Sequence, residues 1–379
     1  MDFNLTEEHQ LIRQIVKEFC DRYVCPIADE VDQKSRFPVE TIQQLAEQEL
    51  MGIPYPEEYG GGGADYLSYI IVLEELARAC ATTAFALELH TSLVEFPLFR
   101  YGTEEQKKKY LTPLCKGEML GSIALAEPET FIDETAVTTT AVGDGNEWVL
   151  NGGRLFISNF PPAGLIIVFA VTDTSAGTGK TSAFIVPAGA PGIRIVRHLK
   201  KAGLRGSIMA EAALENCRIP KENLLGGEGQ GSEIAGITFE GSRIGIAAQA
   251  VGIAQAALDE SIEYSQQRIQ FGQPISSFQA VRDILANMAV DVQAARLLTY
   301  EAAWCYDQEL PYGNQAAMAM LFASATASRQ TNRAVQVHGG IGYVEGSKVE
   351  RLYRDAIIWG SHDGSPDLMR TIIAGNLLR

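Results

Sequence analysis

The residues of this sequence that could take part in chemistry lie mostly in glycine-rich segments. Four consecutive glycines occupy positions 60–63, Gly339 precedes Gly340, and Asp363 precedes Gly364. Each also has an ordinary explanation, because glycine pairs are common in loops and at helix ends and Asp-Gly is a common turn dipeptide. No GxGxxG dinucleotide fingerprint follows an early strand pattern. The six cysteines form no CxxC pair and are too scattered for a secreted disulfide scaffold, so we expect reduced thiols and no metal site.

Charge and composition exclude several classes of partner. The formal net charge of −16 repels phosphate backbones and anionic lipid surfaces, and no long Lys/Arg run offsets it locally. An anionic ligand would therefore depend on individual lysines, arginines and helix N-termini. No apolar run approaches the roughly 20 residues needed to span a bilayer, and residues 1–19 lack the basic and apolar regions of a signal peptide. We expect a cytoplasmic globular protein with no nucleic acid partner and no membrane insertion.

The hydrophobic pattern changes twice along the chain. Up to about residue 119, apolar residues recur at helical spacing. Between about 120 and 230, short runs rich in β-branched and aromatic residues alternate with turn residues, which predicts a β domain. From 231 onward long helical patterns return. We therefore predict three domains, 1–119, 120–230 and 231–379, in an α+β fold with a β-barrel or sandwich between two helical units.

Seven short motifs support a more specific interpretation because of their order and spacing. Each alone is weak evidence, since glycine pairs are commonly loops and an aromatic residue before glycine is commonly core. The motifs are YPEEYGG (55–61), GTEEQ (102–106), NLLG (223–226), RIQFG (268–272), FQ (278–279), QVHGGIGY (336–343) and YRDA (353–356). Together they resemble the acyl-CoA dehydrogenase family over almost the whole chain. The resemblance implies that family's fold, with a C-terminal four-helix bundle and a homotetrameric assembly.

The resemblance also implies FAD, held between the β domain and the C-terminal helices of a neighbouring subunit. The aromatic ring of Phe156 would pack on the flavin, and the Ser158 hydroxyl would bond near N5; ordinary strand core is the alternative for Phe156. A hydride acceptor needs one ring face screened from water and a fixed dipole near N5. The implied cofactor contacts are Leu125, Ala126, Phe156, Ile157, Ser158, Arg268, Gln270, Phe271, Phe278, Gln279, Gln336, Gly339, Gly340, Ser365 and Asp367.

Among these contacts, Arg268 would supply positive charge for the FAD diphosphate. Gly339 and Gly340 would let backbone amides approach phosphate closely, although both glycines could equally cap a helix. At two places the sequence departs from the family pattern: Ala126 stands where threonine is usual, and Phe131-Ile132-Asp133 stands where Gly-Ser-Asp is usual. The contacts of this strip to the flavin and CoA are therefore expected to be remodelled.

The catalytic base implied by the resemblance is Asp363. The reaction needs a carboxylate facing the substrate α carbon opposite the flavin, and counting from the YRDA motif places the family's glutamate position on Asp363. The shorter side chain retracts the carboxylate by about 1.5 Å, and misplacement by roughly 1 Å can cost on the order of a hundredfold in rate. A substrate branched or alicyclic at the α carbon would compensate, and cyclohexanecarboxyl-CoA is the specific candidate. The family's second base position falls on Ser242, which cannot serve.

The resemblance assigns further residues to the substrate. Arg243 and Glu240 would border the thioester and CoA, and Gly364 would follow the base. The backbone N–H of Asp363 and a flavin ribityl hydroxyl would together polarise the thioester carbonyl. Thr91 and Glu95 would form the wall and floor of the acyl pocket.

Two rival functions remain open at this point. The same fold could catalyse 1,4-elimination or enoyl-CoA reduction on a cyclic unsaturated thioester, which would need a second acid such as Glu88 or Glu95. A non-catalytic acyl-CoA-binding scaffold is the rival from another class, although a scaffold has no need of flavin contacts. For the enzyme, an electron-transfer flavoprotein is the expected electron acceptor.

Overall fold

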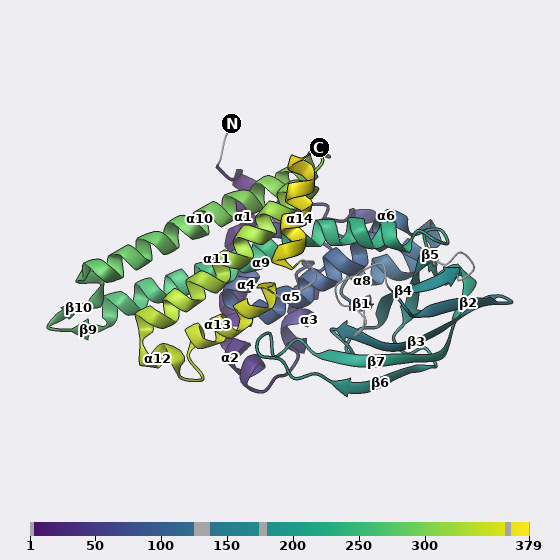
Figure 1. Cartoon of the computed structure of the whole chain (residues 1–379), viewed down its shortest axis with the longest axis horizontal. Helices are drawn as coiled ribbons and strands as arrows, with labels where there is room; N and C mark the ends of the chain where they lie inside the picture. The colour runs from purple at the N-terminus through teal and green to yellow at the C-terminus, as the bar shows by residue number, and fades with distance from the viewer. Residues whose placement is uncertain (1–3, 125–136, 174–179, 361–364, 379) are drawn as a thin grey trace.

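The chain folds into a helical body with a β-sheet at one end (Figure 1). The computed structural model describes residues 4–124, 137–173, 180–360 and 365–378. Three long helices extend away from the sheet toward a tip formed by a short hairpin, and the N-terminal helices pack beside them. Within these ranges, no helix is both long enough and apolar enough to cross a bilayer.

Helices dominate the first third of the chain, as the apolar spacing predicts. The glycine run 60–63 is a loop, and a Cβ on Gly61 would lie 2.2 Å from the Tyr55 carbonyl oxygen. The two helices after this loop are almost entirely buried because they cross the interior. The helices of this part are α1 (Glu7–Phe19), α2 (Cys25–Gln33), α3 (Val39–Glu47), α4 (Tyr66–Ala79), α5 (Ala81–His90), α6 (Phe96–Tyr101), α7 (Glu104–Gln106) and α8 (Thr112–Cys115), with π-helical turns η1 (Cys20–Val24), η3 (Thr91–Glu95) and η4 (Lys107–Leu111).

The middle of the chain forms one open sheet of order β6-β7-β3-β2-β4-β5-β8, with β1 paired in parallel to β4. The described strands do not close into a barrel. A single residue pair, Thr140 with Val171, joins β2 to β4, so the sheet divides into two halves that can fold over one another. The strands are β1 (Gly121–Ala124), β2 (Thr140–Asp144), β3 (Glu147–Ser158), β4 (Leu165–Asp173), β5 (Lys180–Pro187), β6 (Ile193–His198), β7 (Met209–Pro220) and β8 (Leu224–Leu225).

Strand β4 joins two hydrophobic cores. Ile166 and Val168 point into a core inside the sheet domain, whereas the alternating residues Ile167 and Phe169 point into the core formed with the helices. A strand buried on both faces reads as a continuous apolar run, which explains the sequence LIIVFAV at 165–171. The sheet is therefore fixed to the helical body by side chains of its own central strands.

The last third consists of long helices and confirms the predicted α+β architecture. Helix α9 runs for 37 residues and packs very closely on α4, since a Cβ on Gly252 would lie 2.2 Å from the Glu74 carbonyl oxygen. The elements are α9 (Gly231–Gln267), the hairpin β9 (Ile269–Gln270) and β10 (Gln273–Pro274), α10 (Gln279–Asp307), α11 (Gly313–His338), α12 (Gly340–Tyr343), α13 (Lys348–Ala356), the 3-10 turn η7 (Ile357–Gly360) and α14 (Pro366–Leu377).

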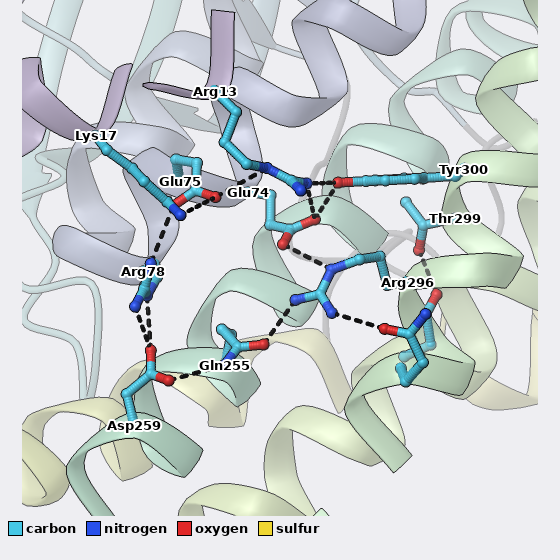
Figure 2. A network of polar contacts seen from close by, with 12 residues as sticks. Arg13, Lys17, Glu74, Glu75, Arg78, Gln255, Asp259, Arg296, Thr299 and Tyr300 are labelled. Carbon is cyan, nitrogen blue, oxygen red and sulfur yellow. Dashed lines mark hydrogen bonds and ion pairs between the residues drawn. The ribbon is translucent and has the colours of Figure 1, made fainter. Parts of the chain in front are cut away.

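A polar network joins four helices in the interior (Figure 2). Glu74 and Glu75 of α4 are buried, and burial together with the Glu74 charge raises the pKa of Glu75. The Arg296 Nε donates to Glu74 Oε1 at 2.9 Å, and the Tyr300 hydroxyl donates to Glu74 Oε2 at 2.8 Å. Arg13 of α1 lies 3.2 Å from Glu75. The network therefore ties α1 and α10 to α4 through two acids that would be unfavourable if left unpaired.

We expect Arg296→Met to lower the free energy of unfolding by about 3–5 kcal/mol, because it leaves the Glu74 carboxylate buried without its nearest cation. The matched control is Arg194→Met, whose partner Glu215 lies at 2.6 Å but whose pair is 58% exposed on both sides; its expected cost is about 0–1 kcal/mol. Thermal and denaturant unfolding measure both. Equal losses in the two variants would contradict a structural role for the network.

Candidate functional site

A hollow of about 430 Å³ lies where α9, the β9–β10 hairpin and the end of α11 meet. It brings together four of the predicted cofactor residues, Arg268, Gln270, Gly339 and Gly340, from positions about 70 residues apart in the sequence. Gly339 has φ +61°, a conformation that favours glycine. A Cβ on either glycine would meet nothing within 4 Å, so their backbones face open space.

The chemistry of this hollow suits an anionic ligand. Its described lining offers the Arg268 guanidinium, the Gln270 side-chain amide and the backbone of two glycines, and it contains no carboxylate. The Gly339 amide itself donates to the Val335 carbonyl oxygen at 2.9 Å. Tyr264 and His338, which also line the hollow, are not among the predicted contact residues. The His338 ring stacks on Tyr264 at 4.2 Å, and His338 Nδ1 lies 2.8 Å from the Ala334 carbonyl oxygen, so it carries the proton and donates it there. The only sequence signal for His338 is its place inside the QVHGG motif.

The remaining predicted C-terminal contacts surround the hollow without lining it. Phe271 is 92% exposed at the tip of the hairpin, 6.1 Å from Phe278 in an edge-to-face arrangement. The Gln279 amide donates to Asp283 at 2.8 Å. Gln336 lines a second hollow of about 590 Å³ together with Arg329 and other residues of α11, α13 and η7. A phenylalanine this exposed calls for a ligand or another protein surface to cover it.

On the sheet side, Phe156 and Ser158 lie at the end of β3 on the face opposite Ile157. Ile157 is buried in the core of the sheet domain, and alternation along the strand directs its two neighbours away from that core. The Ser122 hydroxyl of β1 donates to the Ser158 carbonyl oxygen, which ties β1 to the end of β3. Leu125 and Ala126 lie outside the described residues.

The start of α9 holds the predicted substrate residues together with an unexpected partner. The Ser242 hydroxyl donates to Oε1 of Glu88 on α5 at 2.6 Å. Glu88 is 1% exposed, and burial raises its pKa from 4.5 to about 7, although hydrogen bonds from Ser242 and Ser92 act in the opposite direction. Arg243 follows Ser242 directly. Glu240 lies against the first turn of α11, where a Cβ on Gly313 would meet Glu240 Oε1 at 1.6 Å.

Thr91 and Glu95 are fully buried among the N-terminal helices. The Thr91 hydroxyl donates to the Met51 carbonyl oxygen at 2.8 Å, and Glu95 lies 3.2 Å from His90 Nε2. The Gly121 amide donates to His90 Nδ1 at 3.0 Å, so the proton of the neutral ring is on Nε2, which donates to the Leu114 carbonyl oxygen at 3.2 Å. That these two residues line the acyl pocket stays a prediction.

The other predicted residues near the end of the chain cap a helix or lie outside the description. Ser365 is the N-cap of α14 and accepts from the Leu368 amide at 3.2 Å. Asp367 is exposed and bonds to Arg370 at 2.7 Å. Asp363 and Gly364 lie outside the described residues, so their roles also stay predictions.

Comparison with known proteins identifies the family. The models of the acyl-CoA dehydrogenase N-terminal, middle and C-terminal domains match residues 6–118, 122–217 and 229–378. The chain belongs to the acyl-CoA dehydrogenase family. A short-chain-specific acyl-CoA dehydrogenase of Clostridium acetobutylicum is 44% identical over 379 residues, which cover 100% of both chains. The butyryl-CoA dehydrogenase from Megasphaera elsdenii is similar in structure with a TM-score of 0.97, at 40% identity and with 100% of both chains covered.

FAD is the cofactor of this acyl-CoA dehydrogenase, as the resemblance predicts. A Bacillus anthracis acyl-CoA dehydrogenase that was solved in complex with FAD matches 99% of this chain and 67% of its own, with a TM-score of 0.93 and 31% identity. The residues present fit such a group, since the hollow around Arg268 supplies positive charge, and its two glycines leave open space for a diphosphate to approach the backbone. The predicted oxidoreductase activity is confirmed at the level of the family.

We expect Arg268→Met to weaken FAD binding by about ten- to a hundredfold, because it removes the one charged hydrogen-bond donor among the described residues that line the hollow. Titration of deflavinated protein with FAD, followed by absorbance, measures the change. Arg218→Met is the control, because Arg218 pairs with Asp144 and Glu147 on the exposed edge of the sheet. Unchanged FAD affinity in the Arg268 variant would exclude the hollow as the diphosphate site.

The pKa of Glu88 predicts a pH dependence of stability. Because the folded-state pKa is raised from 4.5 to about 7, the stabilising contribution of the protonated group is complete below about pH 4.5 and is lost as the pH rises through 7. Glu88→Gln abolishes this titration, so the variant should gain up to about 3 kcal/mol relative to the wild type between pH 5 and 9. Melting temperatures across this range test it, with exposed Glu105→Gln as the control. Parallel pH profiles for the wild type and Glu88→Gln would contradict the raised pKa.

Proposed function

We propose that this acyl-CoA dehydrogenase introduces an α,β double bond into a short, branched or alicyclic acyl-CoA, with Asp363 as the base. The observation that carries the proposal is the hollow at Arg268, Gly339 and Gly340, which suits the diphosphate of a redox cofactor. A protein that only binds acyl-CoA would not need such a hollow. The flavin, when bound, accepts the β-hydride. The task left to the chain is to hold the thioester, exclude water and take the α-proton.

The route of the chain near Asp363 supports its assignment. The last described turn before it, η7, ends at Gly360, and Trp359 of that turn is buried against Phe85 of α5 at a ring-centroid distance of 6.1 Å. Phe85 and Glu88 are three residues apart on α5 and therefore share a face. Asp363 thus lies four residues after Trp359 in the sequence, and Trp359 is anchored on the part of α5 that carries Glu88, the partner of Ser242.

Two observations bear on the acyl group. The Clostridium acetobutylicum and Megasphaera elsdenii proteins act on short-chain and butyryl thioesters by name, and they support a short substrate here. Tyrosines crowd the region of Glu88: the Tyr69 hydroxyl bonds to Ser92 at 2.9 Å, and Tyr66 stacks on Tyr306 at 4.1 Å. The shortened base remains the reason to include cyclohexanecarboxyl-CoA, whose ring would bring the α-hydrogen nearer to the wall.

A second candidate function is favoured by Glu88 itself. Glu88 is a buried acid, and no cation among the described residues contributes to the shift of its pKa. A pKa of about 7 suits a group that gives or takes a proton at neutral pH. Such an acid beside the acyl site is what 1,4-elimination, or enoyl-CoA reduction, on an unsaturated cyclic thioester requires. Glu95 fits this role less well, because His90 engages it.

We further propose a homotetramer that passes electrons to an electron-transfer flavoprotein in the cytoplasm. Arg243 and Arg268 are 25 positions apart along α9, a separation of about 38 Å at about 1.5 Å per residue, which is too long for one FAD to reach from the acyl site to the hollow. The hollow would therefore serve the FAD of a neighbouring copy. An exposed stripe at seven-residue spacing on α10, formed by Val290, Leu297 and Trp304, supports helix packing between copies.

The proposal predicts that anaerobic addition of substrate bleaches the flavin absorbance, and that Asp363→Asn retains FAD while losing this bleaching. Thioesters of straight-chain, branched and cyclohexanecarboxylic acids should be titrated in parallel. Bleaching by the cyclic thioester alone supports the alicyclic substrate, and preference for butyryl-CoA removes it. Full bleaching of the Asp363 variant would exclude Asp363 as the base.

The same titrations separate the second candidate. With Glu88→Gln, a saturated substrate should still bleach the flavin if Glu88 has no part in the α,β chemistry. Bleaching by a cyclic enoyl-CoA that Glu88→Gln abolishes would favour 1,4-elimination. A wild-type protein that takes up no FAD would leave only the scaffold function.

A further inference from the structure

The loop that joins β6 to β7, residues 199–208, leaves the sheet domain and is held between two helices of the helical body. Helix α2 lies on one side and α13 on the other. We propose that this loop, through Gly203 and through Leu204 bonded to Asp355, sets the position of α13 and thereby of the chain that carries the base, which makes Asp355 a positioning residue. This inference rests on the proposed role of Asp363.

The contact between the loop and α13 is made by backbone as well as side chains. The Leu204 amide donates to Asp355 Oδ1 at 2.6 Å, and both residues are buried. A Cβ on Gly203 would lie 2.1 Å from the Arg354 carbonyl oxygen, so the loop lies directly on the backbone of α13. Leu204 has φ +46°, a left-handed conformation that a non-glycine residue adopts only at some cost. Little room therefore exists for the loop to slide along α13.

Arg354 extends the same contact to α2. Its two terminal nitrogens donate to the two carboxylate oxygens of Asp32, at 2.8 and 2.6 Å, and Nη1 also lies 3.3 Å from the Ala202 carbonyl oxygen. A bidentate guanidinium–carboxylate pair fixes orientation as well as distance. Arg354 is also bonded to Glu350 one turn earlier on α13. One side chain thus joins α2, the loop and α13.

The loop is itself closed and seated on α2. Lys201 Nζ donates to the Ser207 carbonyl oxygen across the loop. A Cβ on Gly206 would lie 2.4 Å from Val31 and 2.7 Å from the Arg36 carbonyl oxygen. Burial lowers the pKa of Lys201 to about 8 and raises that of Asp355 to about 6. Two ionisable groups are thus kept in an environment that disfavours their charges.

The position of α13 matters because its helix leads into the proposed base. Helix α13 continues without a break into η7, which ends three residues before Asp363. A shift of α13 by one residue is about 1.5 Å, as large as the shortening from glutamate to aspartate. Misplacement of about 1 Å can cost on the order of a hundredfold in rate. A base with a short side chain therefore needs a well-fixed backbone, and the loop supplies a fixed point.

The test compares Gly203→Ala with Gly189→Ala. The first places a Cβ against the Arg354 carbonyl and must push the loop and α13 apart, whereas the control glycine has nothing within 4 Å of its Cβ. In the FAD-loaded enzyme, Gly203→Ala should slow flavin reduction at saturating acyl-CoA by about tenfold or more. The substrate dissociation constant and the FAD content should stay within about threefold of the control.

Asp355→Asn and Asp355→Ala provide a second route if Gly203→Ala does not fold. Asparagine keeps an oxygen that accepts from the Leu204 amide, so it should retain most of the reduction rate. Alanine leaves that buried amide without a partner and should reproduce the slow reduction. Lowered melting temperature with a normal reduction rate, in either Gly203→Ala or Asp355→Ala, would show that the loop only stabilises the fold and would overturn the proposal.

The dependence on Asp363 is measured by combining variants. If the loop acts through the base, Gly203→Ala should slow reduction in the wild type but add nothing to the residual rate of Asp363→Asn. Equal slowing in both backgrounds would overturn the proposal, because the loop would then act elsewhere. Failure of the proposed base shows up separately, as a full reduction rate in Asp363→Asn alone.

Discussion

The close packing of α4 and α5 on α9 is the constraint on which the rest of the structure depends. Gly252 and Gly245 of α9 leave no room for a side chain: a Cβ on the first would meet the Glu74 backbone at 2.2 Å, and on the second the Glu88 side chain at 2.9 Å. The same close approach allows Ser242 to bond Glu88. It also leaves the Glu74 carboxylate where Arg296 of α10 can pair with it. The contacts of α9 with these two helices therefore fix both the acyl side of the site and the structural network.

The buried acids of this protein differ in how their charge is compensated, and the difference suggests what each does. Glu74 is paired with Arg296 and a tyrosine hydroxyl, which is typical of a structural ion pair. Glu95 has a histidine, and Asp355 accepts a backbone amide. Glu88 has only hydroxyl partners and is the acid whose protonation state is most easily changed near neutral pH. Of these four described acids, Glu88 is therefore the one best suited to proton transfer, and the other three suit a structural role.

Much of the fold could be predicted because it is encoded locally. Apolar spacing of three and four residues indicates the helices, and the β-branched runs indicate the sheet. The motifs around Arg268 and Gly339, which are distant in sequence, line one hollow. The contacts that decide the finer arrangement join residues far apart in sequence. Glu88 and Ser242 are 154 residues apart, and Leu204 and Asp355 are 151 apart. The hydrophobic periodicity of the sequence does not predict such contacts, because they depend on which helix faces meet in the fold.

The sequence alone could not decide between a β-barrel and a sandwich, because local patterns do not show how the strands of a sheet are ordered. Alternation predicts which residues of a strand face inward, but β4 is buried on both faces and carries no alternation. A single pair, Thr140 with Val171, joins the two halves of the described sheet, and one residue pair leaves no trace in composition.

The length of α9 has a consequence for how the cofactor is retained. Its beginning holds the acyl side and its end holds the hollow at Arg268, so on the proposed assembly each flavin bridges two copies of the chain. If only the assembled protein can hold the flavin, flavin binding favours assembly of the subunits by mass action. Dilution should then release flavin and subunits together, and the yellow colour of a solution would report its state of assembly.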